Sequence, residues 1–406
     1  MKRIGYLYDK MCDVDLIKEA IHNAAKEKMH YAHVRKIVTN DDKYAQKIKY
    51  ILKEESFEPS PYINDVIKEG PNRKQREISK PRFYPDQVIH WCIYLALKPW
   101  LFNRFYGLNC GSIPGKGVHY GKRHAAKWIR SDRKNTKYYL KLDVRKFYQS
   151  IQPRRIIEKL KRIIKDERFI RINAKILSMS DGLPIGMLLS QVYANFFLTD
   201  IDYWIKQELK AKYYIRYMDD MVIFGNNKKS LHKMREEIDR RLNENGLQLK
   251  SNWQVCRLDK EPLDFMGFRF YRKHTALRKC IMFSITRKVR KAYRAGANVS
   301  AGSAAAVISY LGWITHSDSY GMFCKWIKPY LCISRLKDAV RRKQKYENIR
   351  KLVGGETGRM GQDIQQKQNI PQHRCYPGGR RRNNNLQVYS NRVYEQRVCY
   401  PEPDPG

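Results

Sequence analysis

The chain lacks a long run of apolar residues. In its 406 residues the longest such run, 91–102, is interrupted by Lys98. A helix that spans a bilayer needs about 20 consecutive apolar residues, so this run is too short. The N-terminal residues also lack the apolar core of a signal peptide. We therefore expect a cytoplasmic protein without a membrane partner.

Closely spaced cysteines are also absent. The nine cysteines are odd in number and scattered, and no two form a Cys-x-x-Cys pair. Zinc sites usually present cysteines in such pairs, and disulfide frameworks belong to small secreted chains. The pattern therefore argues against a zinc site and predicts reduced thiols in a cytosolic protein.

Acidic residues are scarce relative to basic ones. The 81 Lys and Arg residues outnumber 40 Asp and Glu residues, which gives a formal net charge of +41. Solubility alone needs far less charge, so we expect a polyanionic partner whose phosphates the basic residues neutralise. The alternative, a membrane surface, would require a basic amphipathic anchor, and none stands out. The hydrophobic content of 42% supports a large core divided into two or three subdomains.

Two adjacent carboxylates lie at the tip of a predicted hairpin. Its arms, 213–217 and 221–224, are rich in β-branched and aromatic residues, and Met218, Asp219 and Asp220 lie between them. Neighbouring negative charges in an apolar setting repel each other, and a divalent cation with oxygen ligands removes that repulsion. An Asp-Asp pair alone is more often a solvated turn, so the metal hypothesis depends on the rest of the chain.

A further carboxylate follows another predicted strand. Asp143 comes directly after the β-rich stretch 138–142. If the two strands are neighbours, Asp143 joins Asp219 and Asp220 in a cluster of three carboxylates. Such a cluster is typical of a two-metal site for phosphoryl chemistry.

Three motifs together resemble those of reverse transcriptases. They are Tyr-Met-Asp-Asp at 217–220, Asp-x-x-x-Phe-Tyr at 143–148 and Leu-Pro-Ile-Gly-x-x-x-Ser-Gln at 183–191. The segment 185–191 more narrowly resembles the bacterial branch that contains diversity-generating retroelements and phage-defence enzymes. The resemblance extends over about residues 1–345.

The resemblance implies an α+β fold of the right-hand polymerase type. We expect an N-terminal region with fingers at 1–135, a ferredoxin-like palm at 136–272 and a helical thumb at 273–350. The alternation of strand, helix, hairpin and helix agrees with such a palm. The basic, low-complexity extension 351–406 has few apolar residues and is predicted to be flexible or to fold on a partner.

The resemblance also implies an activity, an RNA-directed DNA polymerase with Asp143, Asp219 and Asp220 as catalytic residues and metal ligands. The expected cofactors are two Mg²⁺ ions, with Mn²⁺ as an alternative. The expected partners are a template RNA, which could be a dedicated non-coding RNA, a DNA primer or product, dNTPs, and an accessory protein or oligomer. A role in a diversity-generating retroelement and one in antiphage defence both stay open. The alternative function is a catalytically idle RNA-binding scaffold.

The nucleotide pocket is predicted from the same motifs. The family pattern Lys-x-Arg-x-Ile falls on Lys74 and Arg76, which are expected to bind triphosphate, although composition alone favours a solvated basic loop. Tyr148 is expected to exclude a 2′-hydroxyl by its bulk. Met218 is expected to join the pocket.

Two more residues are expected near the template or nucleotide. Gly186 would permit a close approach of either one, and Gln191 would hydrogen-bond a base or the template backbone. The chain departs from the family at Gln87, where Arg is common. Many polymerases have a Lys that protonates the leaving pyrophosphate, but this chain has Trp253 or Gln254 at the corresponding place, and the nearby Lys250 is left without a role.

Hydrophobic periodicity adds a coarse prediction of the other elements. Residues 1–70 and 274–350 are predicted to be mainly helical, and a helix is expected to begin at 125. An amphipathic helix is expected to end before Gly246, and a strand is expected at 247–255.

Overall fold

The computed structural model describes residues 3–69 and 74–353. The side chains of residues 68, 69, 74 and 345–353 lie outside this description. The chain divides into two compact units, Met1–Met266 with Phe270–Lys273, and Gly267–Arg269 with His274–Gly406. Of the predicted extension 351–406, residues 354–406 lie outside the described part of the chain. The predicted boundaries at 135, 272 and 350 stay predictions.

The first unit begins with a group of helices, as predicted. These are α1 (Leu7–Met11), α2 (Val14–Ala25), α3 (Ala32–Thr39) and α4 (Asp41–Lys53). The carboxylate of Asp13 caps α2 by accepting hydrogen bonds from the backbone N–H groups of Asp15 and Leu16. Apolar residues at helical spacing bury one face of α2 against α4 and α5 (Val88–Phe102).

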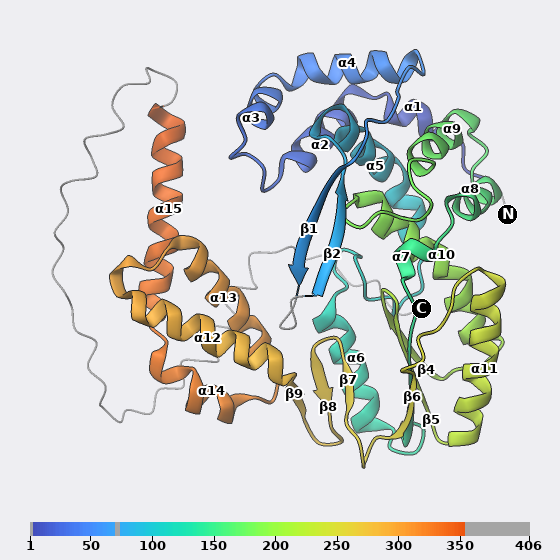
Figure 1. The fold of residues 1–406 in the computed structure, drawn as a ribbon, viewed down its shortest axis with the longest axis vertical. Coiled ribbons are helices and arrows are strands. Elements are labelled where there is room, and N and C mark those ends of the chain that lie inside the picture. Colours follow the sequence, from blue (N-terminus) through green and yellow to red (C-terminus); the bar gives the residue numbers. More distant parts are fainter. Residues whose placement is uncertain (1–2, 70–73, 354–406) are drawn as a thin grey trace, which may run out of the picture. The chain divides into compact units, whose positions relative to one another are not determined.

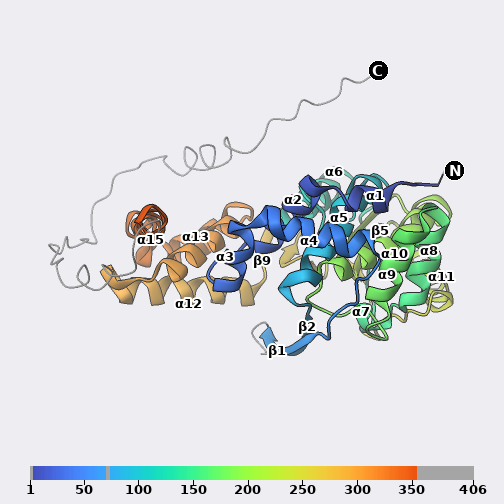
Figure 2. The same ribbon diagram turned by 90° about the horizontal axis from the view of Figure 1, so that it is seen from above.

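Two strands follow where helix and loop were expected. Strands β1 (Ile63–Glu69) and β2 (Lys74–Lys80) form an antiparallel hairpin that projects from the first unit (Figure 2). The helical prediction is therefore wrong over β1, and the basic stretch from Lys74 is a strand rather than a loop. The described side chains of both strands are exposed or half-buried. The hairpin therefore lacks the alternation of buried and exposed residues by which strands are predicted.

A four-stranded antiparallel sheet forms the centre of the first unit. Its strands are β3 (Tyr138–Asp143), β4 (Tyr213–Tyr217), β5 (Asp220–Gly225) and β6 (Gln254–Arg257), in the spatial order β4-β5-β3-β6. The helices between β3 and β4 are α7 (Phe147–Ser150), α8 (Pro153–Ile163), α9 (Glu167–Leu177) and α10 (Leu188–Gln207). Helix α11 (Lys228–Glu244) joins β5 to β6 and packs against β3, β5 and β6 (Figure 1). This connectivity is that of a split β-α-β sheet.

Several boundaries differ from the predicted ones. Helix α6 (Val118–Ser131) begins before residue 125 and packs against β4, and α5 is preceded by a short helical segment, η1 (Phe83–Gln87). The strand expected at 247–255 begins only at Gln254, because a turn interrupts the chain at Ser251 and Asn252. Helix α11 ends before Gly246, as predicted.

The second unit is mainly helical, as predicted for 274–350. Its helices are α12 (Lys279–Ala295), η2 (Gly296–Asn298), α13 (Ala301–Thr315), α14 (Tyr320–Trp326), η3 (Lys328–Tyr330) and α15 (Ile333–Val353). Three short strands precede these helices in the chain: β7 (Leu263–Phe265), which belongs to the first unit, β8 (Phe268–Phe270), which is divided between the two units, and β9 (Thr275–Leu277) of the second unit. Buried residues of α12 recur at helical spacing, and α13 packs against both α12 and α15. Within the described ranges, no helix combines the length and apolar character needed to cross a membrane.

Candidate active site

The predicted hairpin is present, and its turn contains the Asp-Asp pair. Strands β4 and β5 pair with Tyr217 opposite Asp220, so Met218 and Asp219 form a two-residue turn. Met218 adopts a left-handed backbone conformation with φ of 55°. A residue with a Cβ rarely adopts this conformation, so surrounding contacts must hold the turn in place.

The sheet brings Asp143 next to this turn. Asp143 is the last residue of β3, and the antiparallel register places it directly opposite Asp220 on β5. Asp219 precedes Asp220 in the turn, so the three predicted carboxylates lie at the same end of two adjacent strands. The sequence predicted this proximity only on the condition that the two strands are neighbours.

The three carboxylates repel each other in a half-buried setting. Burial raises the pKa of Asp219, and the nearby negative charge of Asp143 raises it further. Burial also raises the pKa of Asp220 to about 6, with further contributions from Asp143 and then Asp219. The site therefore disfavours the fully ionised state unless a positive charge is supplied.

Lys250 supplies one such charge. Its Nζ forms an ion pair with Oδ1 of Asp143, and its backbone N–H donates to the Asp143 carbonyl at 2.8 Å. Residues 248–250 thus continue the pairing with β3 beyond its last regular residue, although they lie outside β6. Sequence reasoning noted Lys250 without assigning it a role.

The donor set fits a hard divalent cation. Carboxylate oxygens are the ligands that Mg²⁺ and Mn²⁺ prefer, and the raised pKa values show that added positive charge is favourable here. In the described part of the chain, no three His, Cys, Asp or Glu side chains already converge as a finished ligand set. A cation bound by Asp143 would compete with Lys250 for the same oxygen.

Tyr148 lies against the tip of the hairpin. It belongs to α7, shortly after Asp143, and its hydroxyl donates a long hydrogen bond of 3.7 Å to the sulfur of Met218. Burial and the charge of Asp219 raise the pKa of Tyr148 to about 12, so the phenol stays neutral at physiological pH. The structure thus places the predicted pocket residues Tyr148 and Met218 in contact.

Gly186 packs closely against strand β2. Its φ is +106°, and a Cβ there would collide with the side chain of Ile78 on β2. The adjacent carbonyl of Ile185 accepts a hydrogen bond of 2.8 Å from the Ser79 backbone. Close packing of the β1–β2 hairpin therefore already explains this glycine, and its predicted approach to template or nucleotide stays a prediction.

The predicted phosphate-binding residues lie on the same hairpin. Arg76 and Ile78 share one face of β2, because side chains alternate along a strand, and Ile78 packs against Gly186. The exposed Arg76 is close enough to Tyr148 for its charge to oppose the rise in the tyrosine pKa. The side chain of Lys74 lies outside the described residues.

Gln191 and Gln87 have contacts within the protein. Gln191, at the start of α10, accepts a hydrogen bond of 3.1 Å from the hydroxyl of Ser112 in the glycine-rich loop. Gln87 donates to the Pro81 carbonyl at 2.7 Å and accepts from the Lys28 ammonium. Gln87, at the position where Arg is common in the family, therefore links the segment after β2 to Lys28.

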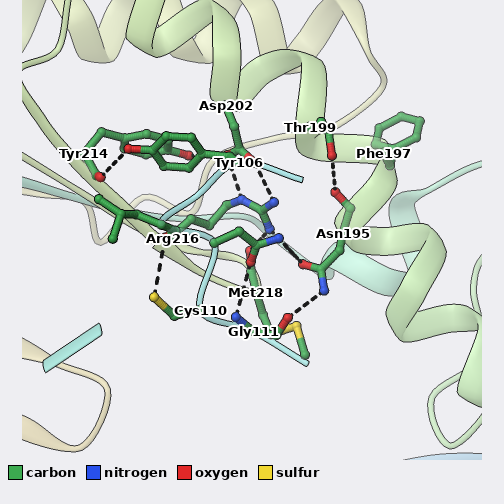
Figure 3. A network of polar contacts seen from close by, with 12 residues as sticks. Tyr106, Cys110, Gly111, Asn195, Phe197, Thr199, Asp202, Tyr214, Arg216 and Met218 are labelled. Carbon is green, nitrogen blue, oxygen red and sulfur yellow. Dashed lines mark hydrogen bonds and ion pairs between the residues drawn. The ribbon is translucent and has the colours of Figure 1, made fainter. Parts of the chain in front are cut away.

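Sequence reasoning missed a buried polar network behind the turn. Arg216 on β4 and Asp202 on α10 are both fully buried and form an ion pair of 2.6 Å (Figure 3). The available signals were Arg216 inside an otherwise uncharged strand and Asp202 inside a largely apolar helix. Such residues are almost never buried unless they are paired.

Two known proteins are related to this chain in sequence. The retron Ec73 reverse transcriptase of Escherichia coli is 24% identical over 218 residues, which cover 48% of this chain and 67% of that protein. The "Uncharacterized 91 kDa protein in cob intron" of Schizosaccharomyces pombe is 26% identical over 179 residues, 41% of this chain. The match covers only 21% of the length of that protein.

Two solved structures are distantly similar. Telomerase from Candida albicans, in complex with a TWJ fragment of telomeric RNA, gives a TM-score of 0.41 at 11% identity over 71% of this chain and 61% of that one. Apo telomerase from Candida tropicalis, truncated from its C-terminal domain, gives 0.40 at 12% identity over 58% and 60%. Likenesses at this level carry no argument about function.

The match to a family model is more informative. The model described as reverse transcriptase (RNA-dependent DNA polymerase) matches residues 68–270. This range is half of the chain and contains the β1–β2 hairpin in large part, the central sheet and all three carboxylates. The chain belongs to the reverse transcriptase family.

Proposed function

We propose that this chain synthesises DNA on an RNA template, with Asp143, Asp219 and Asp220 as its catalytic residues. Family membership supplies the class of reaction, and one observation supports the assignment of the site. The register of the sheet puts Asp143 opposite Asp220, beside Asp219, in a setting that raises the pKa of both turn carboxylates. This arrangement gives three charged oxygen donors at one end of the sheet.

The three aspartates would hold two divalent cations, Mg²⁺ or alternatively Mn²⁺. When bound, these cations would activate the primer 3′-oxygen and neutralise the charge that develops on the leaving pyrophosphate. Lys250 would hold the Asp143 carboxylate in place by pairing with its Oδ1 until a cation binds there. The rigid strands β3 and β5 position the carboxylates before any substrate binds.

The pocket residues are proposed to select and hold the nucleotide. Arg76 and Lys74 on β2 would bind the triphosphate, because a guanidinium and an ammonium are the usual donors to phosphate. Tyr148 and Met218, which contact each other, would form the floor beneath the sugar, and the tyrosine ring would exclude a 2′-hydroxyl.

Gly186 and Gln191 are proposed to lie beside the template or nucleotide. Gln191 is exposed at the start of α10, so its amide can donate to a base or to the template backbone while its carbonyl accepts from Ser112. Gly186 would hold β2 close to this helix.

The larger division of the chain is proposed to follow the right-hand pattern. Residues 1–135 would contribute the fingers, 136–272 the palm, and 273–350 the thumb. The basic side of α12 supports nucleic-acid binding by the thumb, since Arg287, Arg290, Lys291 and Arg294 lie together there. The net charge of +41 agrees with an RNA template and a DNA primer or product as partners.

The biological setting is proposed to be a bacterial retroelement or an antiphage defence system in the cytoplasm. The sequence similarity to a retron reverse transcriptase supports this setting. A dedicated non-coding RNA would serve as template, with an accessory protein or a second copy as a further partner. Sequencing the DNA that the protein makes in cells identifies the template directly.

A primer-extension assay tests the catalytic assignment. The purified protein is expected to extend a DNA primer on an RNA template with dNTPs and Mg²⁺. Asp219→Asn should abolish extension and leave folding and RNA affinity largely unchanged, because it removes one charge and almost no volume. Asp15→Asn is the matched control, since it neutralises an exposed aspartate on α2.

The outcomes separate the proposal from its alternative. If Asp219→Asn extends primers at nearly the parental rate, the metal assignment is wrong. If the parental protein binds RNA tightly but extends no primer with either cation, the chain is an idle RNA-binding scaffold.

A further inference from the structure

The ion pair between Arg216 and Asp202 lies buried behind the catalytic turn, and a gain in stability does not explain its burial. The Arg216 guanidinium contacts Asp202 through two hydrogen bonds, 2.7 Å from Nε to Oδ1 and 2.6 Å from Nη2 to Oδ2 (Figure 3). Both side chains are completely buried. Removing two charges from water is so costly that apolar residues of similar size often stabilise a protein equally well. The pair therefore calls for a role other than stability.

The third guanidinium nitrogen reaches the turn itself. Nη1 of Arg216 donates to the carbonyl oxygen of Met218 at 2.9 Å. That carbonyl belongs to the peptide bond between Met218 and Asp219, and Met218 has the left-handed conformation. Fixing this peptide fixes the direction in which the Asp219 side chain leaves the turn.

A second set of contacts holds the turn from the glycine-rich loop. Nη1 of Arg216 also donates to Oδ1 of Asn195 at 3.1 Å, and Nδ2 of Asn195 donates to the Gly111 carbonyl at 2.8 Å. Gly111 packs so closely on Met218 that a Cβ would lie 2.8 Å from the Met218 backbone nitrogen. The buried network thus joins α10, the loop at 109–111 and the catalytic turn.

The guanidinium group of Arg216 connects α10, the loop at 109–111 and the catalytic turn. Asp202 also accepts a hydrogen bond of 2.6 Å from the Tyr214 hydroxyl, so the carboxylate anchors two buried residues on the same face of β4 to α10. Asp202 itself does not contact the turn. Its contribution is to orient Arg216, which bonds both to Asp202 and to Met218.

We propose that Arg216 is a positioning residue, which Asp202 and Asn195 orient so that it fixes the Met218–Asp219 peptide and thereby the Asp219 carboxylate. This inference rests on the proposed function only where activity is the measured quantity. Loss of Arg216 is expected to loosen the turn, weaken the binding of divalent cations and lower kcat. The KM for dNTP should change less than kcat, because Arg216 contacts the backbone carbonyl of Met218 and not the Met218 side chain, which faces Tyr148.

The decisive variant removes both charges together. Arg216→Met alone would leave Asp202 buried without its cation and is expected to unfold the protein. Arg216→Met combined with Asp202→Leu removes both charges of the pair and should unfold at nearly the parental temperature. Tyr193→Phe is the matched control, since it removes a buried hydrogen bond to Asn173 from the same helix, α10.

Three measurements on the full chain separate positioning from mere stability. In the double variant we expect the backbone amides of residues 218–220 to exchange hydrogen faster than in the parent. Electron spin resonance should show Mn²⁺ affinity lower by about 10–100-fold, and kcat should fall by a similar factor. The KM for dNTP should stay within about twofold. Tyr193→Phe should show parental values in all three. A folded double variant with parental exchange, Mn²⁺ affinity and kcat would overturn the proposal.

A charge-conserving variant covers the case in which the double variant does not fold. Arg216→Lys keeps a cation beside Asp202, but one ammonium cannot replace the fork that also reaches Met218. The same three changes are expected in it, and parental values would overturn the proposal. Exchange and Mn²⁺ binding need no activity, so they test positioning even if the parental protein extends no primer.

Discussion

Replacing Asp220 with asparagine should abolish polymerisation and stabilise the cation-free protein. The two effects have one cause, because the ionised carboxylate that would bind a cation is costly when no cation is present. Burial and the charges of Asp143 and Asp219 all oppose its ionisation. Asparagine has nearly the same shape without the charge. Function and stability are therefore expected to change in opposite directions, as is common at active sites.

The size of the expected gain in the free energy of unfolding follows from the pKa of Asp220. Folding raises it from 3.8 to about 6, and one pKa unit corresponds to about 1.4 kcal/mol. The ionised carboxylate therefore costs at most about 3 kcal/mol at pH 8. The pKa of about 6 already includes the opposing attraction of Lys141 and Lys250, so this cost is net of both lysines. It is an upper bound, because Asp220 is only half-buried and water screens part of the repulsion.

The sign of the pH dependence is specific. A raised folded-state pKa means that the folded protein holds the proton more tightly than the unfolded chain does. The cost of Asp220 is therefore absent below about pH 4, grows as the pH rises through about 6, and is constant above that. The variant and the parent should have similar stability at pH 4, and the variant should be more stable at pH 8.

Urea unfolding in the presence of a chelator measures this difference. The free energy of unfolding would be compared between the parent, Asp220→Asn and the control Asp15→Asn at pH 4–8. Adding Mg²⁺ should stabilise the parent more than Asp220→Asn, since the variant lacks a ligand. The reasoning is refuted if Asp220→Asn is destabilised at pH 8, or if its advantage does not depend on pH.

Three further predictions address the pocket and the charge. Tyr148→Ala should raise the incorporation of rNTPs relative to dNTPs, whereas Tyr148→Phe, which keeps the ring, should not. An unchanged ratio in an active Tyr148→Ala variant would place the gate elsewhere. Gly186→Ala should cost about 1–3 kcal/mol in thermal unfolding, because of its positive φ and the collision with Ile78. Adding Ile78→Ala should recover part of that cost, and no recovery would show that Ile78 is not the obstacle. RNA affinity should fall steeply with salt on a log–log plot, and a flat plot would rule out phosphate neutralisation as the role of the +41 charge.

The sequence alone determined the elements whose patterns are local. The hairpin around Asp219 was predictable, because its apolar arms and short polar turn indicate two strands without reference to the rest of the chain. The helical periodicity of α2 and α11 was visible for the same reason, since each helix buries one stripe of residues. The motifs that resemble reverse transcriptases also indicated the family, to which the matched residues 68–270 assign the chain.

Only the tertiary structure decided which distant groups meet. Strand β3 is separated from β5 by four helices, so the placement of Asp143 opposite Asp220 depends on the register of the sheet. The β1–β2 hairpin was missed because neither strand buries a face, which leaves no periodic signal. The partners of Arg216 and Lys250 are fixed by packing over long sequence separations. The sequence shows which residues are charged, but only the fold shows which residue of opposite charge each one contacts.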